Sequence, residues 1–187
     1  DPVLSRGLGD VYKRQLIRHG QSEWNQQKRF TGWVDVGLTD KGRAEAKKAG
    51  ELIKEKKIKL DSFYSSYQKR ANDTLKIVMK ELNEDENLIT KKWQLNERHY
   101  GELTGLNKED MKKKYGEEKI HQFRRSWDVK PGALDRKSPY HPLNIETYKD
   151  IPVSDIPDTE SLKDTHKRVV DCLSLIHISE PTRQHWI

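Results

Sequence analysis

The chain has 187 residues and carries 36 Lys and Arg against 30 Asp and Glu, a formal net charge of +6. At roughly 150 residues per domain, this length indicates one domain. Hydrophobic residues make up only 33% of the chain, below the about 45–50% that is usual in globular domains. No run approaches the roughly 18 consecutive apolar residues of a membrane span, so no transmembrane helix is expected.

The single cysteine, Cys172, excludes a disulfide framework and a multi-cysteine metal site, and it fits a reducing cytoplasm. The first residues show no cationic stretch followed by an apolar one, so export is not expected. The basic excess favours an anionic partner, which leaves nucleic acid, an acidic membrane surface and phosphorylated small molecules as classes to consider.

The two ends of the chain differ from its middle. Residues 1–15 and 174–187 show no regular hydrophobic period. We predict that both are non-native flanking sequence and that residues 16–173 form the domain.

In chain order, a short strand is expected to end at Leu16–Ile17, although residues 11–15 are poor in the Val, Ile and Leu of a buried parallel strand. A helix is expected from Thr39, as its N-cap, to about Lys56. A brief strand over 62–65 precedes an amphipathic helix from Gln68 to about Leu82.

Residues 89–95 are typical of a further strand, and 107–127 of a helix that breaks at Gly116. Five prolines between Lys130 and Asp158 predict a long loop there. A last helix is expected over 161–173. This alternation predicts an α/β domain with three layers, α/β/α, around a mainly parallel sheet.

The segment Leu16–Asn25, LIRHGQSEWN, contains the residues most suited to chemistry. Open α/β sheets bind ligands at the carboxyl ends of their strands, where this segment is expected. Arg18 offers planar, bidentate donors to a phosphate, and Gly20 lets the backbone approach a bound anion. A neutral histidine in such a place, here His19, can attack phosphorus. An isolated histidine is usually structural, but these neighbours favour a functional one.

RHGQSEWN resembles the RHGE-type signature of the histidine phosphatase superfamily. Three further segments resemble the 2,3-bisphosphoglycerate-dependent phosphoglycerate mutases within it, namely RFTGWVDVGLTDKG, LNERHYGELTGLNK and FRRSW. The resemblance runs from about Leu16 to Leu173. It implies a phosphoglycerate mutase-like fold that is truncated at its C-terminal end.

The resemblance also implies roles for single residues. His19 matches the phosphorylated histidine, Arg18 and Arg70 the arginines that hold the transferring phosphoryl group, and Glu97 the general acid and base. Without the resemblance, Glu97 would more often be interpreted as an N-cap or as an ion-pair partner of Arg98. The remaining residues of the motifs are implied to bind phosphate and substrate: Gly20, Gln21, Ser22, Glu23, Trp24, Asn25, Thr31, Gly32, Arg98, His99, Tyr100, Lys108, Arg124 and Arg125.

Two of these assignments have simpler alternatives. His99 is expected to be structural rather than catalytic, and Arg124–Arg125 also fits a solvated helix face. Cys172 and the tryptophans Trp24, Trp33 and Trp93 are expected to be core or pocket-wall residues.

For the whole protein the resemblance implies interconversion of 2- and 3-phosphoglycerate in glycolysis and gluconeogenesis. It implies a phosphohistidine, 2,3-bisphosphoglycerate as cofactor and intermediate, no metal, a cytoplasmic location and a homodimer or homotetramer. The family's second His-Gly has no counterpart, because His19-Gly20 is the only such dipeptide here. We therefore expect this chain to be a fragment that is inactive or very feeble.

Three other functions remain open. The first is a histidine phosphatase that hydrolyses a phosphorylated metabolite. The second is a basic nucleic-acid-binding module, which the interspersed acidic residues and the lack of a nucleic-acid motif disfavour. The third is a fragment that binds phosphoglycerates without turnover.

Overall fold

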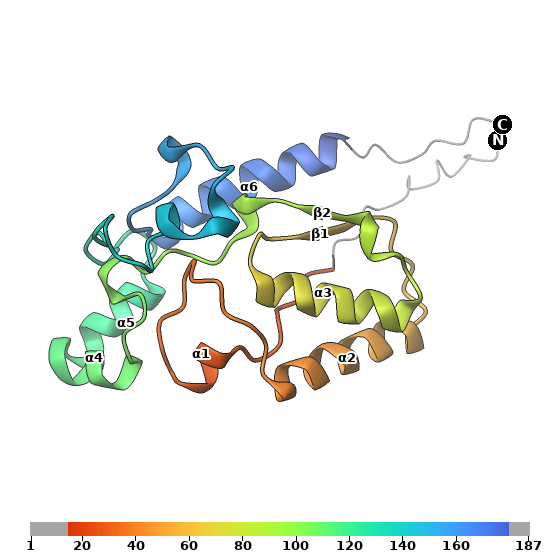
Figure 1. Cartoon of the computed structure of the whole chain (residues 1–187), viewed down its shortest axis with the longest axis horizontal. Helices are drawn as coiled ribbons and strands as arrows, with labels where there is room; N and C mark the ends of the chain where they lie inside the picture. The colour runs from red at the N-terminus through yellow and green to blue at the C-terminus, as the bar shows by residue number, and fades with distance from the viewer. Residues whose placement is uncertain (1–14, 180–187) are drawn as a thin grey trace, which may run out of the picture.

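The computed structural model describes residues 15–179, with side chains up to Ile176. Two short parallel strands lie between helices (Figure 1). The longer elements are α1 (Glu23–Gln26), α2 (Asp40–Glu55), β1 (Phe63–Ser65), α3 (Lys69–Leu82), β2 (Ile89–Lys91), α4 (Lys108–Tyr115), α5 (Glu117–Arg125) and α6 (Leu162–Ser179). Single 3₁₀ turns are η1 (Glu86–Leu88), η2 (Trp93–Leu95), η3 (Gly101–Leu103), η4 (Pro142–Asn144), η5 (Glu146–Tyr148) and η6 (Val153–Asp155).

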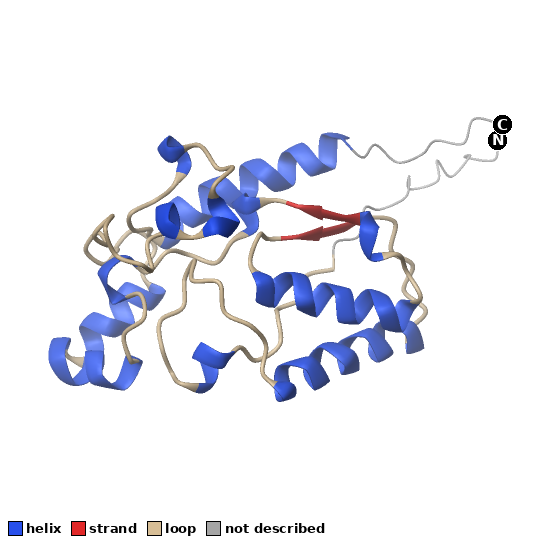
Figure 2. Ribbon diagram, in the orientation of Figure 1, coloured by secondary structure: helices blue, strands red, loops and turns tan. Residues whose placement is uncertain are grey.

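The strands β1 and β2 pair in parallel, with Phe63 opposite Ile89 and Ser65 opposite Lys91. In Figure 2, α2 and α3 lie on one side of these strands and α6 on the other. A parallel pair needs a crossover connection, and α3 supplies it. The predicted layered α/β arrangement with a parallel sheet is confirmed.

Helices α2 and α3 pack against each other through small and buried residues. Thr39 is the N-cap of α2, as predicted, because its hydroxyl accepts a hydrogen bond from the Gly42 amide at 3.1 Å. Val78 and Met79 on α3 are fully buried, and a Cβ at Gly50 of α2 would lie 2.8 Å from Glu81 Cβ and 3.2 Å from Val78 Cα on α3. The absence of a side chain at Gly50 therefore sets how closely the two helices approach.

The residues between α5 and α6 form an ordered segment rather than an open loop. Tyr148, Ile151 and Ile156 are buried together with Trp33. The Tyr148 hydroxyl donates to the Trp33 carbonyl at 2.5 Å. Aromatic burial of this kind contributes strongly to packing. This proline-rich segment thus covers the loop that follows residue 30.

Two strand predictions were wrong in extent or existence. Residues 16 and 17 are not in a strand: Leu16 is 87% exposed, and the backbone beyond it bonds to helices, with the Gly20 amide donating to the Thr74 hydroxyl and the Gln21 carbonyl accepting from the Thr39 amide. The strand expected over 89–95 ends at Lys91, because residues 93–95 turn into η2.

The helical predictions agree more closely with the structure. The break at Gly116 separates α4 from α5, and α3 begins one residue after Gln68. The last helix begins at Leu162 and continues to Ser179, past the expected end at 173. The flanking residues 1–14 and 180–187 lie outside the described residues.

Gly42 provides a test of how tightly the segment before α1 packs on α2. A Cβ at Gly42 would overlap the Gln21 backbone, and a Cβ at Gly20 would overlap the Gly42 backbone. Gly→Ala inside a helix normally gains about 1 kcal/mol in propensity. Because neither backbone can rotate away, we expect Gly42→Ala instead to lower the free energy of unfolding by about 1–3 kcal/mol.

Urea denaturation measures this change. Lys47→Ala, at an exposed position of the same helix, is the control and should stay within about 0.5 kcal/mol of the wild type. A Gly42→Ala protein as stable as the wild type would contradict the close approach.

Candidate active site

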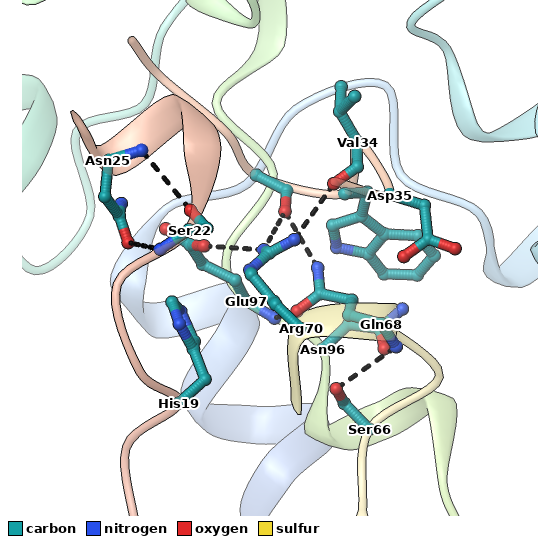
Figure 3. Close-up of polar contacts among 12 residues, drawn as sticks. His19, Ser22, Asn25, Val34, Asp35, Ser66, Gln68, Arg70, Asn96 and Glu97 are labelled. Atoms are coloured by element: carbon teal, nitrogen blue, oxygen red, sulfur yellow. Dashed lines mark hydrogen bonds and ion pairs between the residues drawn. The ribbon is translucent and has the colours of Figure 1, made fainter. Parts of the chain in front are cut away.

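His19 lies in the extended segment before α1, where its ring is held by its own neighbour. Its Nδ1 lies 2.7 Å from the Gly20 carbonyl oxygen. A carbonyl can only accept, so Nδ1 carries the hydrogen and Nε2 carries the lone pair. The side chain is half-buried beside the pair formed by Arg70 and Glu97 (Figure 3). Nε2 is thus the nucleophilic nitrogen of this ring.

The surroundings of His19 favour its neutral form. Burial is the main cause that lowers its pKa below 6.5, and the positive charges of Arg70 and Arg18 lower it further. The bond to Gly20 and the negative charge of Glu97 act in the opposite direction. The net lowering of the pKa means that the imidazole is largely uncharged at pH 7.

The next residues form a short capped turn. Ser22 is fully buried and is the N-cap of α1, and it forms reciprocal hydrogen bonds with Asn25 in a capping box. Gln21 is tied to α2, since its amide donates to Glu45 and its side chain accepts from Thr39. This turn holds the chain next to His19 in one conformation.

Glu23, in the first turn of α1, is exposed to solvent, whereas Trp24 is buried. Trp24 packs edge-on against Tyr140 and lies under the Arg29 guanidinium at 4.3 Å. Trp24 is therefore a packing residue, as expected.

Arg70 is the most deeply buried cation of the site. Its exposed fraction is 0%, and its two terminal nitrogens donate to the carbonyls of Val34 (2.9 Å) and Gly32 (2.8 Å) and to Glu97 Oε2 (2.8 Å). It lies in the first turn of α3, whose N-terminus adds a partial positive charge. Its Nε has no hydrogen-bond partner among the described residues. One buried N–H of this cation is thus left without an acceptor in the described part of the chain.

Glu97 is paired with Arg70 and not with its neighbour Arg98. Its carboxylate is about one-third exposed, with a side-chain exposure of 34%. The Glu97 amide is held by Gln68, which also donates to the Gly32 carbonyl. Gln68 therefore links the two segments that meet at Arg70.

Further cations and a phenol gather near Glu97. Arg98 is buried, with its guanidinium over the Tyr100 ring at 4.8 Å, and its Nε and Nη1 have no partner within residues 15–179. Burial is the main cause that raises the pKa of Tyr100. Burial is also the main cause that lowers the pKa of Lys108, helped by the positive charge of Arg124. These groups form an electropositive wall with spare hydrogen-bond donors.

The remaining predicted site residues differ in burial and in their distance from the site. Thr31 is buried, and its hydroxyl has no partner in the described part of the chain. Gly32 has a φ of +54°, a conformation that favours glycine. Arg18 is exposed, but its positive charge helps to lower the pKa of His19 and of Lys108. Arg125 is exposed at the end of α5 and is not brought into contact with the others.

His99 is fully buried and is held by two hydrogen bonds of its own segment and of Glu160. Its Nδ1 accepts from the Gly101 amide at 3.0 Å, and its own amide donates to Glu160 at 2.8 Å. Burial, with the positive charges of His141 and Arg168, lowers its pKa from 6.5 to about 3. It is a neutral structural residue, as its alternative interpretation had it.

Sequence reasoning missed several residues that hold this site together. They are Asp35, Gln68, Thr74, Glu160 and Arg168. Each acts through a partner many positions away, such as Asp35 with Thr147. No local pattern indicates such pairs.

Within the described residues, no three His, Cys, Asp or Glu side chains come close enough to hold a metal ion. None of the helices between residues 15 and 179 is both long enough and apolar enough to cross a bilayer.

Comparison with protein families decides the relationship. The model of the histidine phosphatase superfamily (branch 1) matches residues 15–187. The chain belongs to this superfamily. The predicted family is thereby confirmed.

Similar curated relatives include several named "2,3-bisphosphoglycerate-dependent phosphoglycerate mutase". The one from Pelagibacter ubique is 66% identical over 155 residues, covering 83% of this chain and 65% of that protein. The one from Borreliella burgdorferi is 50% identical over 160 residues, covering 86% and 64%. The chain thus spans slightly less than two-thirds of their length.

Several solved structures share the fold of this chain. One named "Mycobacterial hydrolase 1" has a TM-score of 0.65 at 21% identity, covering 87% of this chain and 64% of that one. A mycobacterial glucosyl-3-phosphoglycerate phosphatase has a TM-score of 0.65 at 21% identity, covering 87% and 66%. The phosphoglycerate mutase-like fold that the sequence predicted is confirmed.

The buried His99 leads to a prediction about stability in acid. The unfolded chain binds a proton at this histidine near pH 6.5, whereas the folded chain does so only near pH 3. Stability is therefore lost as the pH falls from 6.5 towards 3. Between pH 7 and pH 5 the loss from His99 alone is about 2 kcal/mol.

Denaturation in urea at pH 7 and pH 5 measures this loss, and His99→Gln should show about 2 kcal/mol less of it than the wild type. His121→Gln, which changes an exposed histidine of α5, serves as the control. An unchanged pH dependence in His99→Gln would refute the neutral, buried state.

Proposed function

We propose that this chain is part of a 2,3-bisphosphoglycerate-dependent phosphoglycerate mutase, which interconverts 2- and 3-phosphoglycerate. The observation that carries the proposal is His19 itself, with its Nδ1 held by the Gly20 carbonyl at 2.7 Å beside the Arg70–Glu97 pair. The 66% identity to a mutase over 155 residues supports this substrate class.

In the proposed reaction, His19 Nε2 accepts a phosphoryl group and later returns it. Its lone pair forms the N–P bond while the P–O bond of the donor breaks. The lowered pKa keeps the ring neutral before attack. Phosphoryl transfer depends mainly on positioning and on neutralising charge. Arg70 and Arg18 serve that purpose next to the ring.

Glu97 is proposed to carry the proton of the substrate hydroxyl. The oxygen released from phosphorus takes a proton from the Glu97 carboxyl, and in the reverse direction the carboxylate accepts it. Arg70 holds Oε2 of this group at 2.8 Å. The other oxygen is therefore the one that exchanges the proton.

The wall beyond Glu97 suits a phosphorylated acid. Arg98 has two buried donors without partners, and Lys108 and Arg124 add positive charge. 2,3-bisphosphoglycerate fits these residues as cofactor, since it supplies the phosphoryl group that primes His19. The proposed chemistry requires no metal. A glycolytic mutase would act in the cytoplasm, as a homodimer or homotetramer in this family.

A phosphatase is the second candidate, because one neighbour in fold is named a glucosyl-3-phosphoglycerate phosphatase. A phosphatase needs water at the phosphohistidine, whereas a mutase must exclude it. The proline-rich segment around Tyr148, packed on Trp33, favours a covered site. Release of inorganic phosphate, measured against mutase turnover, separates the two.

Labelling of His19 tests the proposal. Incubation with ³²P-labelled 2,3-bisphosphoglycerate should place an acid-labile, base-stable label on the chain, and His19→Ala should abolish it. Steady mutase turnover is expected to be absent or feeble here, because no second His-Gly occurs in this sequence. Single-turnover labelling with subsequent proteolysis and mass spectrometry does not depend on that turnover.

His121→Ala, at an exposed site on α5, is the matched control and should keep the label. The same variants are then compared in a chain extended by the C-terminal third of the Pelagibacter ubique relative. If the extended wild type takes no label at His19 and shows no mutase turnover, the proposed function is wrong.

A further inference from the structure

Arg168, in the middle of α6, makes an unusually complete set of contacts. Its five N–H groups are all engaged. Nε and Nη2 donate to the two carboxylate oxygens of Glu160, at 2.6 and 2.9 Å. The remaining three hydrogen bonds go to backbone carbonyls of Gln94 (2.5 Å), Asn96 (2.9 Å) and Glu97 (3.2 Å).

Those carbonyls belong to the segment that carries Glu97. Glu160 holds the same segment two residues further on, because its Oε2 also accepts a hydrogen bond from the His99 amide at 2.8 Å. The backbone on both sides of Glu97 is therefore held from α6. The Glu97 side chain, in contrast, meets Arg70 from α3.

Arg168 also touches the other segment that meets Arg70. Its guanidinium lies 5.6 Å from the centre of the Trp33 ring. Trp33 follows Gly32, whose carbonyl accepts from Arg70 at 2.8 Å. One side chain thus adjoins both segments whose spacing places the Arg70–Glu97 pair.

The energetics favour a positioning role over simple stabilisation. The Arg168 and Glu160 side chains are only 11% and 5% exposed. Removing two charges from water offsets most of their attraction, so buried ion pairs add little net stability compared with apolar packing. What a planar guanidinium provides is fixed geometry towards several acceptors at once, which lysine lacks.

We propose that Arg168 is a positioning residue, which acts through the Glu97 backbone to place the Glu97 carboxyl against the leaving oxygen. This inference rests on the proposed function, in which Glu97 protonates that oxygen. As His19 Nε2 bonds to phosphorus, the P–O bond breaks and its electron pair goes to oxygen, which takes the Glu97 proton. A donor whose leaving group is a weak base needs no such proton.

That difference gives an experiment on the full chain. Single-turnover labelling of His19 is followed from two ³²P donors, 2,3-bisphosphoglycerate and 2,4-dinitrophenyl phosphate. The Arg168→Gln chain should be labelled about 10- to 100-fold more slowly by the first donor. With the second donor its rate should stay within about 3-fold of the wild type, because general-acid help is not needed.

Glu97→Gln should show the same difference in labelling rate between the two phosphoryl donors, which links the effect to the Glu97 carboxyl. Lys167→Ala is the matched control on α6, since Lys167 is exposed and pairs only with Asp171, at 3.2 Å, in the structure described. It should match the wild type with both donors.

A second variant separates positioning from folding. Arg168→Gln leaves the Glu160 carboxylate buried without its cation, so it is compared with Arg168→Met combined with Glu160→Gln. This double variant removes both charges together and should melt at a higher temperature than Arg168→Gln, because no buried carboxylate is left without a cation. It should still be labelled slowly by 2,3-bisphosphoglycerate and normally by 2,4-dinitrophenyl phosphate, because methionine cannot donate hydrogen bonds to the three carbonyls.

The outcomes are distinct. An equal loss with both donors, or a double variant that is labelled normally by 2,3-bisphosphoglycerate, overturns the positioning role and leaves the proposed function intact. An extended wild-type chain, with the C-terminal third of the Pelagibacter ubique relative, that is labelled at His19 by neither donor overturns the proposed function and this inference with it.

Discussion

The ion pair between Arg70 and Glu97 is the contact on which the rest of the site depends. A guanidinium with no exposed surface is tolerated only if its donors are satisfied. The structure gives its two terminal nitrogens one carboxylate and two carbonyls, those of Gly32 and Val34, and leaves only Nε without a partner among the described residues. Three segments must therefore arrive at one place, and most of the fold serves to bring them there.

Each of those segments is held from a different direction. The segment around Gly32 is covered by Trp33 and Tyr148 of the buried aromatic cluster. The segment of Glu97 is held by α6 through Arg168. Arg70 itself stands at the beginning of α3, where helix packing fixes the backbone. Because each support comes from a distant part of the chain, the site exists only after the domain has folded.

This dependence explains what the sequence could and could not predict. Local signals predicted α2 from its Thr39 cap and α3 from its apolar face, and both helices are present. Motif resemblance selected His19, Arg70 and Glu97, which the structure brings together. Without that resemblance, the sequence offered Arg98 as a partner for Glu97, because neighbours in sequence are visible and residues 27 positions apart are not. Arg168 lies 71 or more positions from the carbonyls it binds, and no periodicity encodes such a pairing.

The charge balance of the site bears on how His19 stays reactive. Arg70 and Arg18 both lower its pKa, and an incoming phosphate would offset their charges and so favour the protonated ring. A protonated imidazole has no lone pair with which to attack phosphorus. Burial, however, is the largest cause of the lowered pKa, and a bound ligand increases burial instead of cancelling it. The neutral ring therefore depends chiefly on burial of the imidazole, with a smaller contribution from the charges of Arg70 and Arg18.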